Sequence, residues 1–128
     1  MIVLKSTQEK VLGALQSVSG IVERRHTLPI LANVLIRKVA NKIQLTTSDL
    51  EIQIRTNTEF EGDNGDFTTT VGARKLIDIL RTMPADQMVS IESSASKLIL
   101  KGGKSKFTLQ TLPAEDFPLV QESSNLGP

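Results

Sequence analysis

The sequence predicts an α+β domain in which two helices pack on one face of an antiparallel sheet. One amphipathic helix is expected to begin near Thr7 and a second to span Ala73–Met83, and each is followed by several short runs typical of strands. The two halves of the chain, Met1 to about Glu61 and Asp66 to about Leu119, repeat the order of strand, helix and strands. This repetition indicates an internal duplication.

Composition limits the classes of function. The 128 residues suffice for one domain with a hydrophobic core. The formal net charge of +1 does not by itself indicate a nucleic-acid partner. The chain has no cysteine, which excludes a disulfide framework and a thiolate metal site. Met1–Ser6 does not resemble a signal peptide and the apolar run Ile30–Ile36 is too short to span a membrane, so a cytoplasmic location and no membrane partner are expected.

The first half begins with a β-type run, Ile2–Lys5, and then a helix. Ser6 and Glu9 have the spacing of a capping box, which predicts the helix start near Thr7. Its apolar face, which should pack on the sheet, consists of Val11, Leu12, Leu15, Val18 and Val22. Its opposite face is small and polar, with Lys10, Gly13, Ala14, Gln16, Ser17 and Gly20. The residues alone favour an ordinary solvent-exposed face for this second set over a functional surface.

The middle of the chain predicts strands. Pro29 favours an extended or turn conformation at Leu28, and Ile30–Ile36 is typical of a buried strand. The runs Ala32–Val39 and Lys42–Ser48 are joined by Ala40-Asn41, a plausible tight hairpin. A strict alternation follows, with Leu50, Ile52, Ile54 and Thr56 on the face expected to be buried and Glu51, Gln53, Arg55 and Asn57 on the other.

No catalytic or metal-binding group can be assembled from the sequence. Asp49 and Glu51 are two residues apart, but no nucleophile, histidine or glycine-rich loop accompanies them, so a structural role is favoured. The acidic segment Glu61–Asp66 lacks the alternating ligands and closing glutamate of a calcium loop and is expected to be a turn. His26 has no second metal-binding side chain nearby. No cofactor and no metal are expected.

The second half repeats the pattern. The helix Ala73–Met83 is expected to end at Pro84, with Leu76, Ile77, Leu80 and Met83 on its apolar face and Arg74, Asp78 and Arg81 on the opposite face. Three strands are predicted after it: Gln87–Glu92, Lys97–Lys101 and Lys104–Leu112. In the last, Phe107, Leu109 and Thr111 share one face and Lys106, Thr108 and Gln110 the other, and its flanking lysines favour an edge strand. The tail Gln121–Pro128 has the composition of a linker.

Five motifs carry a resemblance to a known family. They are Arg25-x-Thr27-Leu28-Pro29-Ile30-Leu31-x-Asn33, Thr47-x-Asp49-Leu50-Glu51, Ala73-Arg74-Lys75, Gly103-Lys104-Ser105-Lys106-Phe107, and Thr111-Leu112-Pro113-Ala114-x-Asp116-Phe117-Pro118. Together they cover the chain from Met1 to about Leu119 and resemble the N-terminal domain of the bacterial sliding clamp, the β subunit of DNA polymerase III. The chain departs from the family at His26, where a proline often follows the arginine.

This resemblance implies a DNA-clamp fold with a pseudo-twofold internal repeat, over a domain of residues 1–120, and a linker at 121–128 toward a missing second domain. It implies a non-catalytic replication processivity factor, part of a head-to-tail homodimer ring that encircles duplex DNA and slides without sequence specificity. The polymerase III core and the clamp loader would bind through domains absent here. Arg25 and Arg74 are the implied DNA contacts, with Arg24, Lys10, Gln16 and Arg81 as further candidates. The implied ring interface consists of Lys75, Lys106, Phe107 and Leu109.

One alternative function and one expectation about oligomeric state accompany the processivity-factor hypothesis. A protein-interaction domain with an exposed edge strand and no DNA role of its own fits the same pattern of residues. The resemblance implies that this chain carries one edge of the ring contact and not its complement, so the isolated domain is expected to be a monomer, or at most to associate weakly.

Overall fold

The computed structural model describes residues 2–21, 29–48, 52–63, 65–94 and 97–117. Its α-helices and strands are, in chain order, β1 (Ile2–Thr7), α1 (Gln8–Val18), β2 (Asn33–Val39), β3 (Lys42–Ser48), β4 (Gln53–Glu59), β5 (Phe67–Gly72), α2 (Ala73–Leu80), β6 (Met88–Ser94), β7 (Lys97–Gly102) and β8 (Ser105–Leu112). Short 3₁₀ helices lie at Ser19–Ile21, Pro29–Ala32 and Ala114–Asp116.

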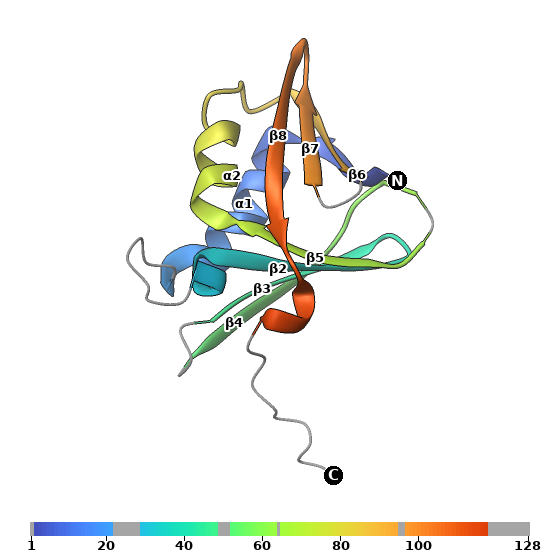
Figure 1. Cartoon of the computed structure of the whole chain (residues 1–128). Coiled ribbons are helices and arrows are strands. Elements are labelled where there is room, and N and C mark those ends of the chain that lie inside the picture. The colour runs from blue at the N-terminus through green and yellow to red at the C-terminus, as the bar shows by residue number, and fades with distance from the viewer. Residues whose placement is uncertain (1, 22–28, 49–51, 64, 95–96, 118–128) are drawn as a thin grey trace.

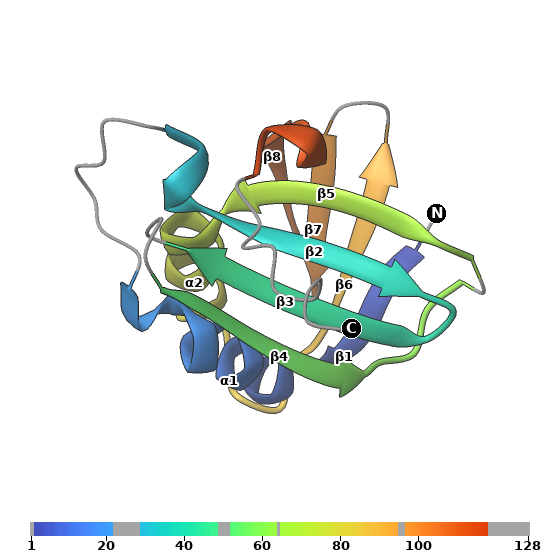
Figure 2. The same ribbon diagram turned by 90° about the horizontal axis from the view of Figure 1, so that it is seen from below.

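The strands form one curled antiparallel sheet in the order β1-β6-β7-β8-β5-β2-β3-β4 (Figures 1 and 2). One half consists of β1, β6, β7 and β8, and the other of β5, β2, β3 and β4. The halves join where Thr70 and Val71 of β5 pair with Leu112 and Thr111 of β8. At the other end of the sheet order, an isolated bridge joins Lys5 of β1 to Glu61, just after β4. The sheet therefore closes around the side that carries the helices.

The predicted duplication is confirmed by the topology. Each repeat consists of a strand, a helix and three strands, with β1 to β4 in the first and β5 to β8 in the second. The repeats exchange their first strands, because β1 pairs with β6 of the second repeat and β5 pairs with β2 of the first. Neither repeat has a complete sheet of its own, so the eight strands form a single folding unit.

Both helices cover the same face of the sheet (Figure 1). The predicted apolar face of α1 is confirmed, since Val11, Leu15 and Val18 are buried and Leu12 is half-buried against the core, whereas Val22 lies outside the described residues. The predicted face of α2 is confirmed in the same way. Its residues Leu76, Ile77 and Leu80 are buried, and Met83 packs partly against the same cluster. The helices and the inner faces of the strands thus share one hydrophobic core.

The start of α1 differs from the predicted capping box. Thr7 is the N-cap and makes no side-chain capping bond. Carbonyls from the loop before β6 accept the first helical N–H groups: Gln8 N donates to Gln87 O at 2.7 Å and Glu9 N to Ala85 O at 3.0 Å. The Glu9 N–H, which the predicted capping box would satisfy, is therefore occupied by a distant segment of the chain, as is the N–H of Gln8.

The segment after Pro29 differs from the prediction. Ile30–Ile36 was expected to be a strand throughout, but Pro29–Ala32 forms a 3₁₀ helix and β2 begins at Asn33. The fixed φ of proline suits the first position of a helical turn as well as it suits an extended segment. The hairpin at Ala40-Asn41 is confirmed, and Ala40 adopts a positive φ of 56°, as tight hairpin turns require.

The alternation along β4 is confirmed from Ile54 to Glu59, but Gln53, which was expected on the exposed face, is half-buried. Ile54, Thr56 and Thr58 are half-buried, whereas Arg55, Asn57 and Glu59 are exposed. Ile52 was expected to be buried but is 54% exposed, because it precedes the strand and does not belong to its pleat. Leu50, Glu51 and Asp49 lie outside the described residues.

The end of α2 is also earlier than predicted. The helix ends at Leu80 rather than Met83, and the next N–H groups form tighter bonds, from Thr82 to Ile79 O at 3.1 Å and from Met83 to Leu80 O at 3.0 Å. Pro84 has no N–H to donate to Leu80, and its ring would clash with that carbonyl in a regular helix. The Leu80 carbonyl also accepts a hydrogen bond from the buried side-chain amide of Gln8, at 2.6 Å. This bond ties the start of α1 to the end of α2.

Candidate nucleic-acid interface

The outer face of α2 carries two of the candidate DNA contacts. Arg74, Asp78 and Arg81 are exposed on the face opposite the buried Leu76 and Leu80. Arg74 lies in the first turn and Arg81 is the C-cap residue. Seven positions separate them, which corresponds to about 10 Å along a helix axis. The stripe thus presents two guanidinium groups, one near each end of α2.

The outer face of α1 is polar but offers few free charges. The Lys10 ammonium donates to the Glu59 carbonyl at 2.7 Å and lies 4.9 Å from the centre of the Phe60 ring. Lys10 is therefore held against the end of β4. Gln16 is exposed, and the hydroxyl of Ser17 donates to the Ala14 carbonyl at 2.7 Å. Short side chains that bond to their own helix leave this face smooth.

The two helices place these groups on one surface. The bond from Gln8 to Leu80 puts the first turn of α1 beside the last turn of α2, and both helices lie on the same side of the sheet (Figure 1). We call α1 and α2 together the helical layer. Lys10 and Arg81 belong to one end of this layer, and Gln16 and Arg74 to the other. The arrangement brings four of the six predicted DNA-contact residues onto one layer.

Arg24, Arg25 and His26 lie outside the described residues. The segments on either side of them are described. The 3₁₀ helix Ser19–Ile21 follows directly from α1, and Asn33 at the start of β2 pairs with Gly72, the residue before α2. Both flanks therefore lie at the end of the helical layer that carries Arg74.

The predicted ring interface surrounds the unpaired side of β8. This strand pairs with β7 from Ser105 to Gln110, but with β5 only at Thr111 and Leu112. A cavity of about 300 Å³ lies beside it, and its lining includes Lys75, Thr108, Leu109 and Gln110. The expected proximity of Lys75 to this strand is thus confirmed.

The four ring-interface candidates differ in burial. Lys75 and Lys106 are exposed. Leu109 is only 3% exposed in the single chain, and Phe107 packs partly against the core cluster. An acidic substitution at Leu109 would therefore act first on the fold of the domain, and the side chains available to a partner at this edge are Lys106, Thr108 and Gln110.

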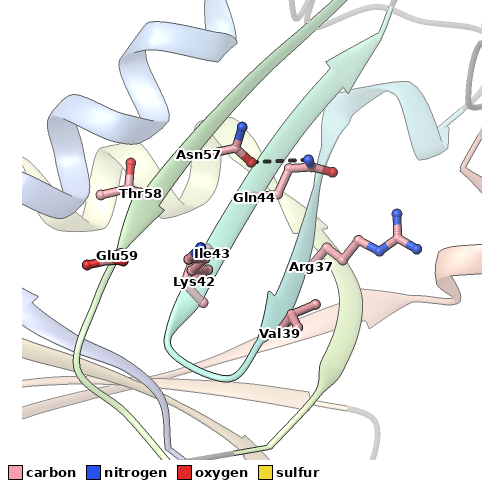
Figure 3. Close-up of a pocket in the computed structure, with 8 residues that line it drawn as sticks. All are labelled: Arg37, Val39, Lys42, Ile43, Gln44, Asn57, Thr58 and Glu59. Carbon is pink, nitrogen blue, oxygen red and sulfur yellow. Dashed lines mark hydrogen bonds between the residues drawn. The ribbon is translucent and has the colours of Figure 1, made fainter.

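A groove that the sequence did not predict lies on the opposite face of the sheet (Figure 3). It has a volume of about 550 Å³ and crosses β2, β3 and β4, with Arg37, Val39, Lys42, Ile43, Gln44, Asn57, Thr58 and Glu59 in its lining. The Gln44 amide donates to the Asn57 side-chain oxygen at 3.1 Å across its floor. Val39 is 54% exposed here while its neighbour Lys38 is buried. Strand alternation is the signal that could have indicated it, because Lys38 falls on the same face of β2 as Val34 and Ile36, which leaves Val39 on the outer face with Arg37.

The described part of the chain contains no group of three or more histidine, cysteine, aspartate or glutamate side chains that could hold a metal ion. Among the same residues, no helix is long and apolar enough to cross a membrane. The surface features that remain are the helical layer, the edge of β8 and the groove.

Comparison with known sequences identifies the family of this chain. The family model described as "DNA polymerase III beta subunit, N-terminal domain" matches residues 3–121. The chain belongs to this family. A beta sliding clamp from Pseudomonas putida is 44% identical over 115 residues, which cover 90% of this chain and 31% of that protein. One from Vibrio harveyi is 38% identical over 108 residues, covering 84% of this chain and 74% of that sequence.

Solved structures of DNA polymerase III beta subunits have the same fold. The crystal structure of the beta subunit from Pseudomonas aeruginosa superposes with a TM-score of 0.87 at 41% identity, over 96% of this chain and 33% of that one. The DNA polymerase sliding clamp from Caulobacter crescentus gives a TM-score of 0.86 at 32% identity, over 94% and 33%. The α+β clamp fold predicted from the sequence is thereby confirmed. The chain spans about a third of the length of most of these relatives.

Proposed function

We propose that this chain is the first domain of a DNA replication processivity factor, part of a ring that encircles duplex DNA and tethers the replicative polymerase. The observation that carries this proposal is the helical layer, which is separate from both sheet edges. In a ring whose domains join edge to edge through their sheets, such a layer is free to face the enclosed duplex. A closed ring is retained by topology, so its contacts with DNA need not be tight.

Sliding requires contacts without sequence readout. Phosphate contacts position a protein on DNA, whereas hydrogen bonds to base edges would hold it at particular sequences. Arg74 and Arg25 are our primary candidates for phosphate contacts, with Arg24, Arg81, Lys10 and Gln16 as secondary ones. Because the Lys10 ammonium is already bound to a carbonyl, we rank it below Arg81. The near-neutral net charge of +1 suits weak contact.

The rest of the assembly is proposed to come from sequence outside this chain. Residues 1–120 form the domain and residues 121–128 are a linker toward a second domain. The unpaired side of β8, with Lys75 and Lys106 beside it, joins a domain of another subunit in a head-to-tail homodimer. The polymerase III core and the clamp loader bind to the other domains. We propose a non-catalytic protein that acts in the cytoplasm, with no cofactor.

The DNA contacts are tested in a chimera that joins this chain to the second and third domains of the Pseudomonas aeruginosa beta subunit. Binding to a fluorescent circular duplex is titrated at several salt concentrations. Arg74→Ala and Arg25→Ala are each expected to weaken binding equally on different sequences, and to reduce the slope of log K against log salt by about 0.9.

Arg37→Ala is the matched control, since Arg37 is also exposed but lies on the opposite face of the sheet. It should leave the slope unchanged. Losses that depend on the DNA sequence, or an effect of Arg37 equal to that of Arg74, would contradict the proposal. Absence of DNA binding at every salt concentration would favour the alternative, a protein-interaction domain without a DNA role.

A further inference from the structure

Two cationic side chains lie in the groove on the outer face of the sheet, opposite the helices. Arg37 on β2 and Lys42 on β3 are exposed, and neither forms an ion pair with any residue that the structure describes. Lys42 lies opposite Val39, and Arg37 stands two residues before Val39 on the same strand. The two cations are therefore diagonal neighbours on one face, about 7–8 Å apart, a spacing that long side chains can bridge. One carboxylate placed between them could accept hydrogen bonds from both.

The same groove offers an apolar contact and free amide groups. Val39 is more than half exposed beside the two cations. The Gln44 side-chain amide donates to the side-chain oxygen of Asn57 (Figure 3). Within the described part of the chain, this leaves the Asn57 side-chain N–H groups and the Gln44 side-chain oxygen without partners. A donor and an acceptor of this kind suit the N–H and C=O groups of a peptide backbone.

Carboxylates flank the two cations on both sides. Glu59 of β4 lies opposite Lys42. Glu115 is exposed and lines a neighbouring cavity of about 210 Å³, which also borders Arg37 on the side of β5. Across the face, the charges therefore run negative, positive, positive, negative. A ligand with negative charge along its whole length, such as a strand of nucleic acid, would be repelled at both ends. The pattern matches a ligand with one central carboxylate.

We propose that this groove binds an extended segment of another protein, in which one acidic residue stands beside an aliphatic one. The acidic side chain accepts hydrogen bonds from Arg37 and Lys42, and the aliphatic side chain packs on Val39. Neighbouring strands lie about 4.8 Å apart, so about three extended residues suffice to cross from β2 to β4. The inference rests on the outer face of the sheet alone and does not depend on the proposed DNA contacts of the helical layer.

The test is an NMR titration of the isotope-labelled 128-residue chain with the peptide Gly-Leu-Glu-Leu-Gly, blocked at both ends. Peptide is added to about 10 mM, which nearly saturates a site with a millimolar dissociation constant. The backbone amide resonances of Arg37, Val39 and Gln44 are expected to shift. The neutral peptide Gly-Leu-Gln-Leu-Gly should bind about fivefold more weakly, because it lacks the charge that exposed cations attract. Gly-Ser-Glu-Ser-Gly should also bind more weakly, because it has no aliphatic side chain to pack on Val39.

Variants of the groove test the charge pattern. Arg37→Gln and Lys42→Gln should each weaken binding of the glutamate peptide about twofold to fivefold. Glu59→Gln should strengthen it about twofold, because a repelling carboxylate is removed. Lys97→Gln is the matched control, since Lys97 is an exposed cation on β7 that does not line the groove, and it should leave binding unchanged. All four side chains are exposed, so the variants are expected to fold, and unchanged resonances elsewhere in the spectrum establish this.

Equal affinity for the glutamate and glutamine peptides would overturn the proposal. So would shifts confined to residues outside the groove, the absence of any shift at the highest peptide concentration, or weaker binding by Glu59→Gln. A single-stranded thymidine oligonucleotide is titrated in the same way. If it binds at the groove more tightly than the glutamate peptide, the groove is a nucleic-acid site and the proposal is wrong.

Discussion

At the scale of single residues, Leu109 ties β8 to the domain core. Its neighbours Thr108 and Gln110 are exposed, but Leu109 itself is 3% exposed and belongs to the main hydrophobic cluster. Leu109→Ala is expected to lower the free energy of unfolding of the isolated chain by about 2–4 kcal/mol, because it removes buried methyl groups and leaves a cavity. Urea denaturation followed by circular dichroism measures the change.

The neighbouring Thr108→Ala is the matched control and should change stability by less than about 0.5 kcal/mol. A loss below 1 kcal/mol for Leu109→Ala, or equal losses at both positions, would contradict the placement of Leu109 in the core.

Ala40 is the second residue with a defined energetic role. It adopts a φ of 56° in the hairpin between β2 and β3, a conformation that costs a residue with a Cβ about 1 kcal/mol. Its hydrogen bonds use backbone atoms. The Ala40 carbonyl accepts a hydrogen bond from the Lys38 ammonium, and the Ala40 N–H donates to Asp66 Oδ1 at 3.3 Å. Ala40→Gly retains them and is expected to raise the melting temperature. The opposite glycine substitution, Ala14→Gly within α1, should lower it.

At the scale of elements, α1 contains a glycine that its packing does not require. A Cβ at Gly13 would meet no atom within 4 Å, and the residue is exposed in the middle of the helix. Gly13→Ala is therefore expected to stabilise the chain by about 0.5–1 kcal/mol through helix propensity alone. Equilibrium denaturation gives the value, with Gln16→Ala on the same face as a control expected to have little effect. A destabilising Gly13→Ala would show that this face is packed.

The elements themselves were largely predictable. Alternation of apolar and polar residues over 53–59 and 105–112 identified β4 and β8, and helical spacing identified the buried faces of α1 and α2. The ends of the elements were harder to predict. The start of α1 is fixed by carbonyls of Ala85 and Gln87, nearly eighty positions away, so no local capping rule could describe it.

The candidate site was predictable only in part. Helical spacing put Arg74 and Arg81 on the exposed face of α2, but the assignment of a DNA role came from the family motifs. Periodicity placed Phe107 and Leu109 on one face of β8 without indicating which face the helices cover. The place of β4 at the end of the strand order could not be predicted, because that order depends on the exchange of β1 and β5 between repeats.

At the scale of the whole molecule, the two halves of the sheet are joined at few points. One of these joins is closely packed. Next to the bridge between Lys5 and Glu61, a Cβ on Gly62 would lie 2.8 Å from the Val3 carbonyl oxygen. Gly62→Ala must push the strands apart there and is expected to destabilise the domain by about 1–3 kcal/mol. Gly20→Ala, where a Cβ meets nothing within 4 Å, is the control. Hydrogen exchange at Lys5, whose N–H donates across this join, should accelerate in the first variant only.

The exchange of first strands has a consequence for biosynthesis. β1 is synthesised before the other described strands, but its only described partner strand, β6, ends at Ser94, so Ile2 cannot pair with Glu92 until β6 has been translated. The nascent first repeat therefore carries an apolar strand, with Val3 and Leu4, that has no place in the partial sheet formed by β2, β3 and β4. Completion of the fold must wait for the second repeat, and a stalled or truncated first half would expose that strand to chaperones and to other nascent chains.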